Sequence, residues 1–324
     1  MKTDAPILSV KDLIVQFQIK RRFGRKATLT AVDKMSFDIK RGKTLAIVGE
    51  SGSGKTTAAL TVARLVKPKS GSITLAGEDF MALEGEALRR ARAKIQVIFQ
   101  DPFSSLNPRL RAEDIVREPM ESLGTLPKHQ HAARVDELFE QVGLRPEQKH
   151  LFPHQFSGGQ RQRIGIARAL ATNPDVIICD EAVSALDVAV QAQILNLLRR
   201  LQRDLGLTYL FISHDLGVVQ HMCDDIVVMY MGRIVESGSR MEVFSNPSHP
   251  YTQALLEAVP SVAKLKGERE VLSSITGEAP DPLNLPKGCN FASRCPKVMD
   301  TCRVEQPRLE NHAGAHLSAC YLPN

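Results

Sequence analysis

The sequence contains no tryptophan and few aromatic residues of any kind. Phe, Tyr and Trp together make up 5% of its 324 residues, while the formal net charge is +6. A net positive charge is compatible with binding to phosphate groups, to nucleic acid or to an anionic membrane surface, and does not distinguish among them. Proteins that bind nucleic acid strands combine basic residues with aromatic side chains on which the bases stack. The scarcity of aromatics therefore argues against a nucleic-acid-bound protein.

Long apolar runs are also missing. No uninterrupted stretch of 18 apolar residues occurs, and the opening "MKTDAPILSVKDL" lacks the basic and apolar segments of an export signal. We therefore expect neither a membrane-spanning helix nor a signal peptide. The 43% of hydrophobic and 24% of charged residues are ordinary for a globular protein. The length suits one large domain with an appendage.

Cysteine is sparse, with six residues in the chain, which argues against a secreted disulfide framework. Four of the six lie near the C-terminus, at Cys289, Cys295, Cys302 and Cys320. Their spacing, C-x5-C-x6-C-x17-C, lacks the CxxC pairs that are typical of structural zinc. A disulfide clip, a metal site and a coincidence are all open at this point.

What the sequence does contain is a phosphate-binding loop. "GESGSGKT", residues 49–56, fits GxxxxGK(S/T) between an apolar strand and an amphipathic helix. The glycines let backbone N–H groups turn toward phosphate oxygens, and the helix N-terminus favours the same anion. Lys55 is suited to reach the β- and γ-phosphates, and Thr56 to ligate Mg²⁺. The predicted contacts in this segment are Gly49, Glu50, Ser51, Gly52, Ser53, Gly54, Lys55, Thr56 and Thr57.

A second apolar strand ends in two acids. Residues 176–179 are apolar, so Asp180 and Glu181 emerge at the C-terminal edge of the strand, where open α/β sheets bind ligands. Asp180 is suited to hold Mg²⁺, and Glu181 to orient or deprotonate an attacking water. With the phosphate loop upstream, the pair predicts nucleotide hydrolysis.

Further motifs lie around these two elements in a fixed order. They are Gln100 in "QVIFQDP", "FSGGQ" at 156–160, "SALD" at 184–187 and His214 in "LFISHDL". Over about residues 5 to 260 the chain thereby resembles the nucleotide-binding subunits of ABC transporters. The resemblance implies ATP and Mg²⁺ as cofactors. It also implies a dimer, in which "SGGQ" faces the γ-phosphate of ATP bound to the other subunit.

The resemblance assigns roles residue by residue. Gln100 contacts Mg²⁺ and the lytic water, and His214 contacts the γ-phosphate. Phe17 stacks on adenine, with Phe23 as a substitute and core packing as an alternative for both. Members of the family usually have Pro where this chain has Ala182, so we expect a looser link after Glu181. The dimer contacts to nucleotide fall on Ser157, Gly158, Gly159, Gln160 and Asp187.

The expected fold is an α/β P-loop NTPase of ABC type. Residues 1–260 form the nucleotide-binding domain, with a mainly parallel core sheet and an antiparallel β subdomain. A helical subdomain at about 101–171 carries "FSGGQ". Residues 261–324 form a small Cys-containing C-terminal extension that begins with a linker at 261–288.

Two segments, "FQDPFSSLNPR" and "NPSHPYTQALLEAVP", resemble the oligopeptide and dipeptide import subfamily. The resemblance implies a peripheral ATPase at the cytoplasmic face of the inner membrane. Its expected partners are two transmembrane permease subunits, a periplasmic or extracellular solute-binding protein, and a related ATPase subunit, with a homodimer as the alternative. Import of nickel, glutathione or another small solute is the alternative function. A nucleic-acid-associated ABC ATPase is disfavoured.

The tail also resembles the C-terminal extension of peptide-importer ATPases, some of which carry a 4Fe-4S cluster. In a reducing compartment a disulfide is disfavoured, so the resemblance implies iron–sulfur ligation by the four cysteines, with Zn²⁺ as the alternative. His312 and His316 are expected to be solvated loop residues.

Overall fold

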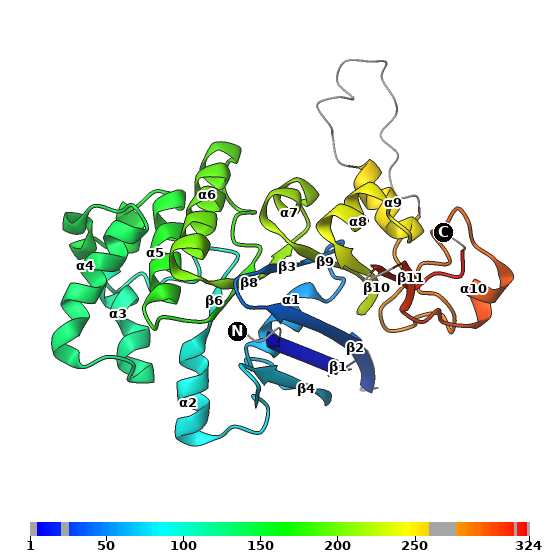
Figure 1. Cartoon of the computed structure of the whole chain (residues 1–324), viewed down its shortest axis with the longest axis horizontal. Helices are drawn as coiled ribbons and strands as arrows, with labels where there is room; N and C mark the ends of the chain where they lie inside the picture. Colours follow the sequence, from blue (N-terminus) through cyan, green and yellow to red (C-terminus); the bar gives the residue numbers. More distant parts are fainter. Residues whose placement is uncertain (1–4, 21–25, 259–276, 314–315, 323–324) are drawn as a thin grey trace, which may run out of the picture.

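The computed structural model describes residues 5–20, 26–258, 277–313 and 316–322. Phe23 and residues 261–276 of the expected linker lie outside these ranges. The described chain contains two sheets with a helical region at one end and the C-terminal residues at the other (Figure 1). The sequence prediction of an α/β fold with a parallel core, an antiparallel sheet and a helical region is confirmed.

The larger sheet has eight strands, in the order β11-β12-β10-β9-β3-β8-β7-β6. The five strands from β9 to β6 are parallel, whereas β10, β12 and β11 are joined by antiparallel pairings. Its strands are β3 (Thr44–Val48), β6 (Ile95–Ile98), β7 (Val176–Asp180), β8 (Thr208–Ser213), β9 (Asp225–Tyr230), β10 (Arg233–Ser239), β11 (Glu310–Ala313) and β12 (His316–Ser318).

The parallel strands are apolar along their length because both of their faces are covered. In β3, Leu45 and Ile47 belong to a core shared with the second sheet, while Ala46 and Val48 face the helices of the other side. Parallel pairing of β8 with both β3 and β7 brings the carboxyl ends of these three strands together at one edge. The phosphate loop, the acid pair and His214 follow these three strands.

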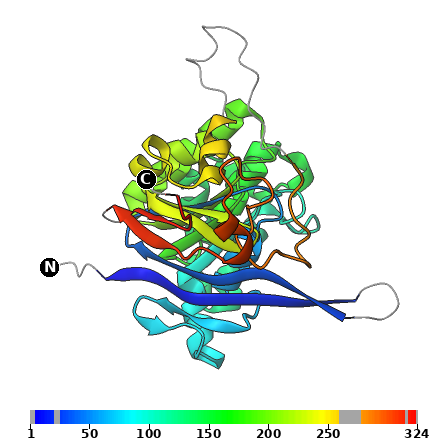
Figure 2. The same ribbon diagram turned by 90° about the vertical axis from the view of Figure 1, so that its right-hand side faces the viewer.

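The second sheet is antiparallel, in the order β2-β1-β4-β5. Figure 2 shows β1 and β2 as a long two-stranded ribbon at one side of the molecule. Along β1 the apolar residues turn inward to a common core with α1, which contacts both sheets. The strands are β1 (Pro6–Lys20), β2 (Lys26–Lys40), β4 (Ser70–Leu75) and β5 (Glu78–Asp79).

The helices cover the sheets and form the helical region. Helices α3, α4 and α5 lie within the range 101–171, and α5 packs against both α3 and α6. Within the described ranges, no helix combines the length and the apolar character that crossing a membrane requires. The helices are α1 (Lys55–Val62), α2 (Gly85–Lys94), α3 (Ala112–Leu123), α4 (His131–Gln141), α5 (Gly158–Leu170), α6 (Val188–Leu205), α7 (Leu216–Met222), α8 (Arg240–Ser245), α9 (Pro250–Glu257) and α10 (Asp300–Val304).

The C-terminal extension is built onto the core sheet. Its strand β12 pairs with β10, where Glu236 lies opposite Ser318 and Ser237 opposite Leu317. The expectation of a solvated His316 is wrong, because its ring is only 3% exposed and Nε2 lies 2.7 Å from Oε1 of Glu236. Pairing of β12 with β10 turns this histidine inward, and no local pattern in the sequence signals that pairing.

Glu236 connects three parts of the chain while having no exposed surface. Besides His316 of β12, its carboxylate accepts 2.8 Å hydrogen bonds from the backbone N–H groups of Ser248 and His249, at the start of α9. Removal of the carboxylate would leave these donors buried without a partner, which is costly.

Glu236→Ala is therefore expected to lower the free energy of unfolding by about 3 kcal/mol, as measured by urea denaturation. Glu236→Gln, which keeps one acceptor oxygen, should lose less. The exposed Glu78 of β5 is a suitable control, and Glu78→Ala should stay within about 0.5 kcal/mol of the unaltered protein. Equal stability of Glu236→Ala and the unaltered protein would contradict the assigned role.

Candidate active site

The loop between β3 and α1 is shaped by glycines that no other residue could replace. Gly49 has φ +154 and Gly54 has φ +102. A Cβ atom on Gly49 would lie 2.1 Å from the carbonyl oxygen of Met229, and one on Gly54 would lie 2.1 Å from that of Ala31. The loop is thus pressed against β9 and β2, in a glycine-rich conformation of the kind that forms an anion-binding concavity.

Lys55 lies inside this loop and is 4% exposed. Its Nζ donates hydrogen bonds of 2.8 Å to the carbonyl oxygens of Gly49 and Glu50. Burial lowers the pKa of the ammonium group, although nearby Glu181, Asp180 and Glu50 oppose that change. A positive charge held in a glycine loop at a helix N-terminus is the arrangement that binds a phosphate chain.

Two oxygen ligands for a cation meet beside the loop. The Thr56 hydroxyl donates a 3.0 Å hydrogen bond to Oδ1 of Asp180, at the end of β7. Burial raises the pKa of Asp180, and the hydrogen bond from Thr56 opposes that shift. Hydroxyl and carboxylate oxygens suit Mg²⁺, which usually binds few protein ligands together with substrate phosphates. These residues therefore fit the predicted magnesium site.

The three predicted catalytic residues also come together. Oε2 of Glu181 accepts a 2.8 Å hydrogen bond from Nε2 of Gln100, and its Oε1 lies 3.1 Å from Nδ1 of His214. The Glu181 side chain is 14% exposed, against 55% for His214. Glu181 has φ +47, a conformation that is unfavourable for a residue with a Cβ and that clusters at functional sites.

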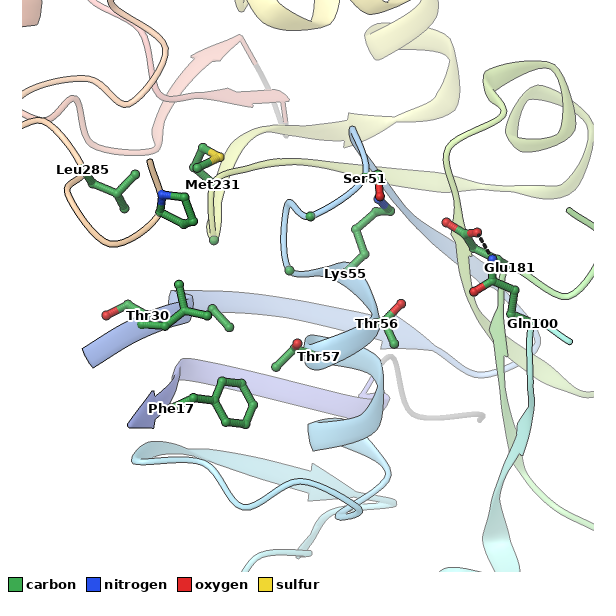
Figure 3. A pocket seen from close by; sticks show the side chains of 16 residues that line it. Phe17, Thr30, Ser51, Lys55, Thr56, Thr57, Gln100, Glu181, Met231 and Leu285 are labelled. Atoms are coloured by element: carbon green, nitrogen blue, oxygen red, sulfur yellow. Dashed lines mark hydrogen bonds between the residues drawn. The ribbon is translucent and has the colours of Figure 1, made fainter. Parts of the chain in front are cut away.

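Lys55, Thr56, Gln100 and Glu181 line one cavity of about 340 Å³, which is the size of a small-molecule site. Asp180 and His214 do not line it, but they are bonded to Thr56 and Glu181, which do. In Figure 3 the Glu181–Gln100 pair lies at one end, Lys55 and Thr56 lie in the middle, and Phe17 lies at the other end, below Met231 and Leu285. Phe17 is 39% exposed, so it is available to stack on a ligand. The lining residues are Phe17, Leu29, Thr30, Ala31, Ser51, Gly52, Gly54, Lys55, Thr56, Thr57, Gln100, Glu181, Met231, Gly232, Pro282 and Leu285.

Sequence reasoning did not assign Pro282 and Leu285 to this cavity. They belong to the C-terminal extension and lie in the segment expected to be a linker. A short proline-containing loop has no motif that could have placed it there.

Two family models match this sequence. The one described as "ABC transporter" matches residues 32–184, and the one described as "Oligopeptide/dipeptide transporter, C-terminal region" matches residues 235–302. The chain is 49% identical to the oligopeptide transport ATP-binding protein AppF of Bacillus subtilis (strain 168), over 98% of its own length and 97% of that protein's. The chain belongs to the ABC transporter family. It is also 45% identical to the dipeptide transport ATP-binding protein DppF of Escherichia coli (strain K12), over 98% of its length and 94% of that protein's.

Solved ABC proteins have the same fold. The cbiO1 protein of Clostridium perfringens, part of the ABC transporter complex cbiONQ, matches with a TM-score of 0.63 and 30% identity, covering 75% of this chain and 92% of that one. The ATP-binding cassette MJ0796, solved as a dimer bound to ADP and Pi, matches with a TM-score of 0.63 and 28% identity, covering 72% of this chain and 98% of that one. Like other ABC subunits of this type, the chain is a transport ATPase.

The ABC signature segment lies away from the cavity of its own chain. Ser157 caps α5, because its Oγ accepts from the N–H of Gln160 at 3.3 Å while Oε1 of Gln160 accepts from the N–H of Ser157 at 3.0 Å. Ser157 is thus the N-cap of α5, and a capped helix start also presents N–H groups to an anion. A Cβ on Gly159 would lie 2.4 Å from Cγ1 of Val190, so α5 and α6 pack closely at this point. Asp187 caps α6 through a 2.9 Å bond from the N–H of Val190.

The four cysteines of the extension line one small pocket of about 20 Å³, together with Phe291 and neighbouring residues. All four are free thiols. Burial raises the pKa of Cys289 to about 11, and the neighbouring Cys302, Cys295 and Cys320 add to that rise. In the described part of the chain, no group of three or more His, Cys, Asp or Glu residues is arranged to hold a metal ion. The predicted iron–sulfur site is therefore not supported, although its four residues do converge.

Proposed function

We propose that this chain is the ATP-hydrolysing subunit of an importer for di- or oligopeptides. The observation that carries the proposal is its similarity, over almost its whole length, to ATP-binding proteins named for oligopeptide and dipeptide transport. The matched C-terminal region belongs to the same class of transporter. Import of nickel, glutathione or another small solute is the alternative, since a separate binding protein and the permease would select the solute.

The catalytic roles follow from the geometry of the cavity. The glycine loop and Lys55 bind the phosphate chain, and Thr56 and Asp180 would hold Mg²⁺, which neutralises phosphate charge when bound. Glu181 accepts a proton from the attacking water at its carboxylate, while Gln100 and His214 hold that carboxylate from its two sides. Phe17 provides an aromatic ring at the opposite end of the cavity, where the adenine base would bind.

A permease would dock beside Gln100. A surface groove of about 260 Å³ lies between the core sheet and α3, and Phe99 borders it with 37% of its surface exposed. Leu65, on the same groove, is 57% exposed. Apolar residues exposed in a groove suit the apolar face of a short partner helix. Phe99 directly precedes Gln100, which is hydrogen-bonded to Glu181. Movement of the partner helix in the groove would therefore displace Gln100 and change its contact with Glu181.

The remaining partners follow from the same proposal. The capped start of α5 would face ATP on a second ATPase subunit, with a related chain as first choice and a second copy of this chain as the alternative. The subunits would work at the cytoplasmic face of the inner membrane, with two transmembrane permease subunits and a periplasmic or extracellular solute-binding protein.

The test is reconstitution of the chain with its permease and solute-binding protein in lipid nanodiscs. ATP hydrolysis should rise when the binding protein is loaded with peptide, and should not respond to DNA or RNA. Stimulation by nickel, by glutathione or by nucleic acid instead of peptide would refute peptide import. The matched control is the same assembly with the binding protein free of solute.

We further propose that the four-cysteine pocket binds an iron–sulfur cluster. The support is chemical: four thiols surround one small space, and thiolates ligate iron and zinc alike. Anaerobic purification with metal analysis should then find iron together with visible absorption near ~400 nm. Zinc without that absorption, or intact thiols without either metal, would refute it.

A further inference from the structure

We propose that the C-terminal extension forms one wall of the nucleotide pocket, where Pro282 and Leu285 face the base from the side opposite Phe17. The inference rests on the proposed binding of ATP in this cavity. It makes the extension part of the ATP site of its own subunit, and so gives a role to a segment to which no catalytic motif belongs.

The cavity has two chemically different ends. Its polar end contains Gln100, Glu181 and the glycine loop, which suit phosphates and a cation. Its other end is lined by Phe17, Leu29, Met231, Pro282 and Leu285. Figure 3 shows Leu285 and Met231 across the cavity from Phe17. A flat, largely apolar base fits the second end, held between an aromatic ring and aliphatic side chains.

An ion pair anchors this wall to the phosphate loop. Arg294 of the extension donates two hydrogen bonds to Glu50, from Nη1 to Oε2 at 2.7 Å and from Nη2 to Oε1 at 3.0 Å. The side chains are 6% and 31% exposed, so the pair is better shielded than a surface ion pair. Two parallel bonds from one guanidinium fix orientation as well as distance.

Aromatic packing holds the same segment in place. Phe291, which is 1% exposed, lies with its ring centre 5.3 Å from that of Tyr230 and 5.4 Å from that of Tyr251. The Tyr251 hydroxyl accepts a 2.8 Å hydrogen bond from the N–H of Glu50. Nδ2 of Asn290 also donates a 3.4 Å hydrogen bond to the carbonyl oxygen of Met231. The extension is thus fixed to the loop and to the β9–β10 turn, and the wall it carries has a defined place.

Binding measurements on two ligands separate the wall from the phosphate cradle. The probes are a non-hydrolysable β,γ-imido ATP, which has a base, and tripolyphosphate, which has none, both with Mg²⁺ and the full chain in a calorimeter. Leu285→Ala should raise the Kd of the nucleotide about fivefold, because apolar contact with the base is lost. The Kd of tripolyphosphate should stay within about twofold.

Leu285→Met, which keeps an apolar side chain of similar volume, should restore nucleotide affinity. Leu283 is the matched control, since it is a half-buried leucine two residues away that does not line the cavity. Leu283→Ala should leave both affinities unchanged. Thermal unfolding of each variant checks that the chain is folded.

An equal loss for both ligands, or no loss for either, overturns the inference while leaving the proposed ATPase intact. If the unaltered protein binds neither ligand, the proposed nucleotide site fails and the inference fails with it. Loss confined to the nucleotide, with rescue by Leu285→Met, supports the wall.

Discussion

Replacement of Glu181 by Gln is expected to lower the rate of ATP hydrolysis about 10²- to 10⁴-fold while leaving ATP binding nearly unchanged. The amide is the same size as the carboxylate and can keep hydrogen bonds to Gln100 and His214, but it cannot accept a proton from water. The measurement is steady-state phosphate release together with the Kd for ATP from calorimetry. Binding and turnover should therefore separate.

The exposed Glu78 of β5 provides the control, because Glu78→Gln makes the same chemical change at a residue that does not line the cavity. It should leave both quantities unaltered. Hydrolysis by Glu181→Gln at the normal rate would refute the assigned base. A loss of ATP binding equal to the loss of turnover would instead point to a role for Glu181 in holding the ligand.

Gly54→Ala is expected to weaken ATP binding at least about 100-fold, which corresponds to about 2.7 kcal/mol. The new Cβ would lie 2.1 Å from the carbonyl oxygen of Ala31 and 2.9 Å from Cε of Met229. The backbone at this position, with φ +102, is also unfavourable for alanine. The loop must therefore move, and its N–H groups would no longer converge on phosphate.

Gly77→Ala separates backbone strain from the clash. Gly77 has φ +85 but no atom within 4 Å of an added Cβ, and it lies in the β4–β5 turn. This variant should lose some stability, about 1 kcal/mol, and no ATP affinity. Calorimetric Kd values and melting temperatures of the two variants test the difference. Equal ATP affinity in Gly54→Ala and the unaltered protein would contradict the proposed loop geometry.

The parts of the site that were predictable from sequence are those that follow strands. Asp180 and His214 end or follow apolar strands, Lys55 follows another across the glycine loop, and parallel strands bring their carboxyl ends to one edge. The alternation of apolar strands and polar residues in the sequence therefore predicts both the site residues and their position at the carboxyl edge of the sheet. The φ of Glu181 was not predictable, because positive φ at a carboxylate has no signature in composition or spacing.

Contacts made by the extension were beyond such reasoning. Arg294 and Glu50 are 244 residues apart, and each belongs to a segment in which a charged residue is unremarkable. The burial of His316 depends on the pairing of β12 with β10, which is specified by only a short register. Long-range polar contacts of this kind form only when the folded segments come together, so no local sequence pattern predicts them. The looser link expected at Ala182 stays a prediction, and the turn is held by a 3.0 Å bond from the Ser184 hydroxyl to the carbonyl oxygen of Glu181.

The position of β12 has a consequence for any attempt to use the first 260 residues as an independent unit. Truncation at residue 260 would remove β12, the strand that pairs with β10 on the side away from β9. The N–H and C=O groups of β10 on that side would then lie unpaired at the edge of the sheet. Unprotected borders recruit strands from other molecules, whereas the native border is the short β11, which carries Glu310 and Asn311. We therefore expect a chain trimmed at this point to aggregate, even with every catalytic residue in place.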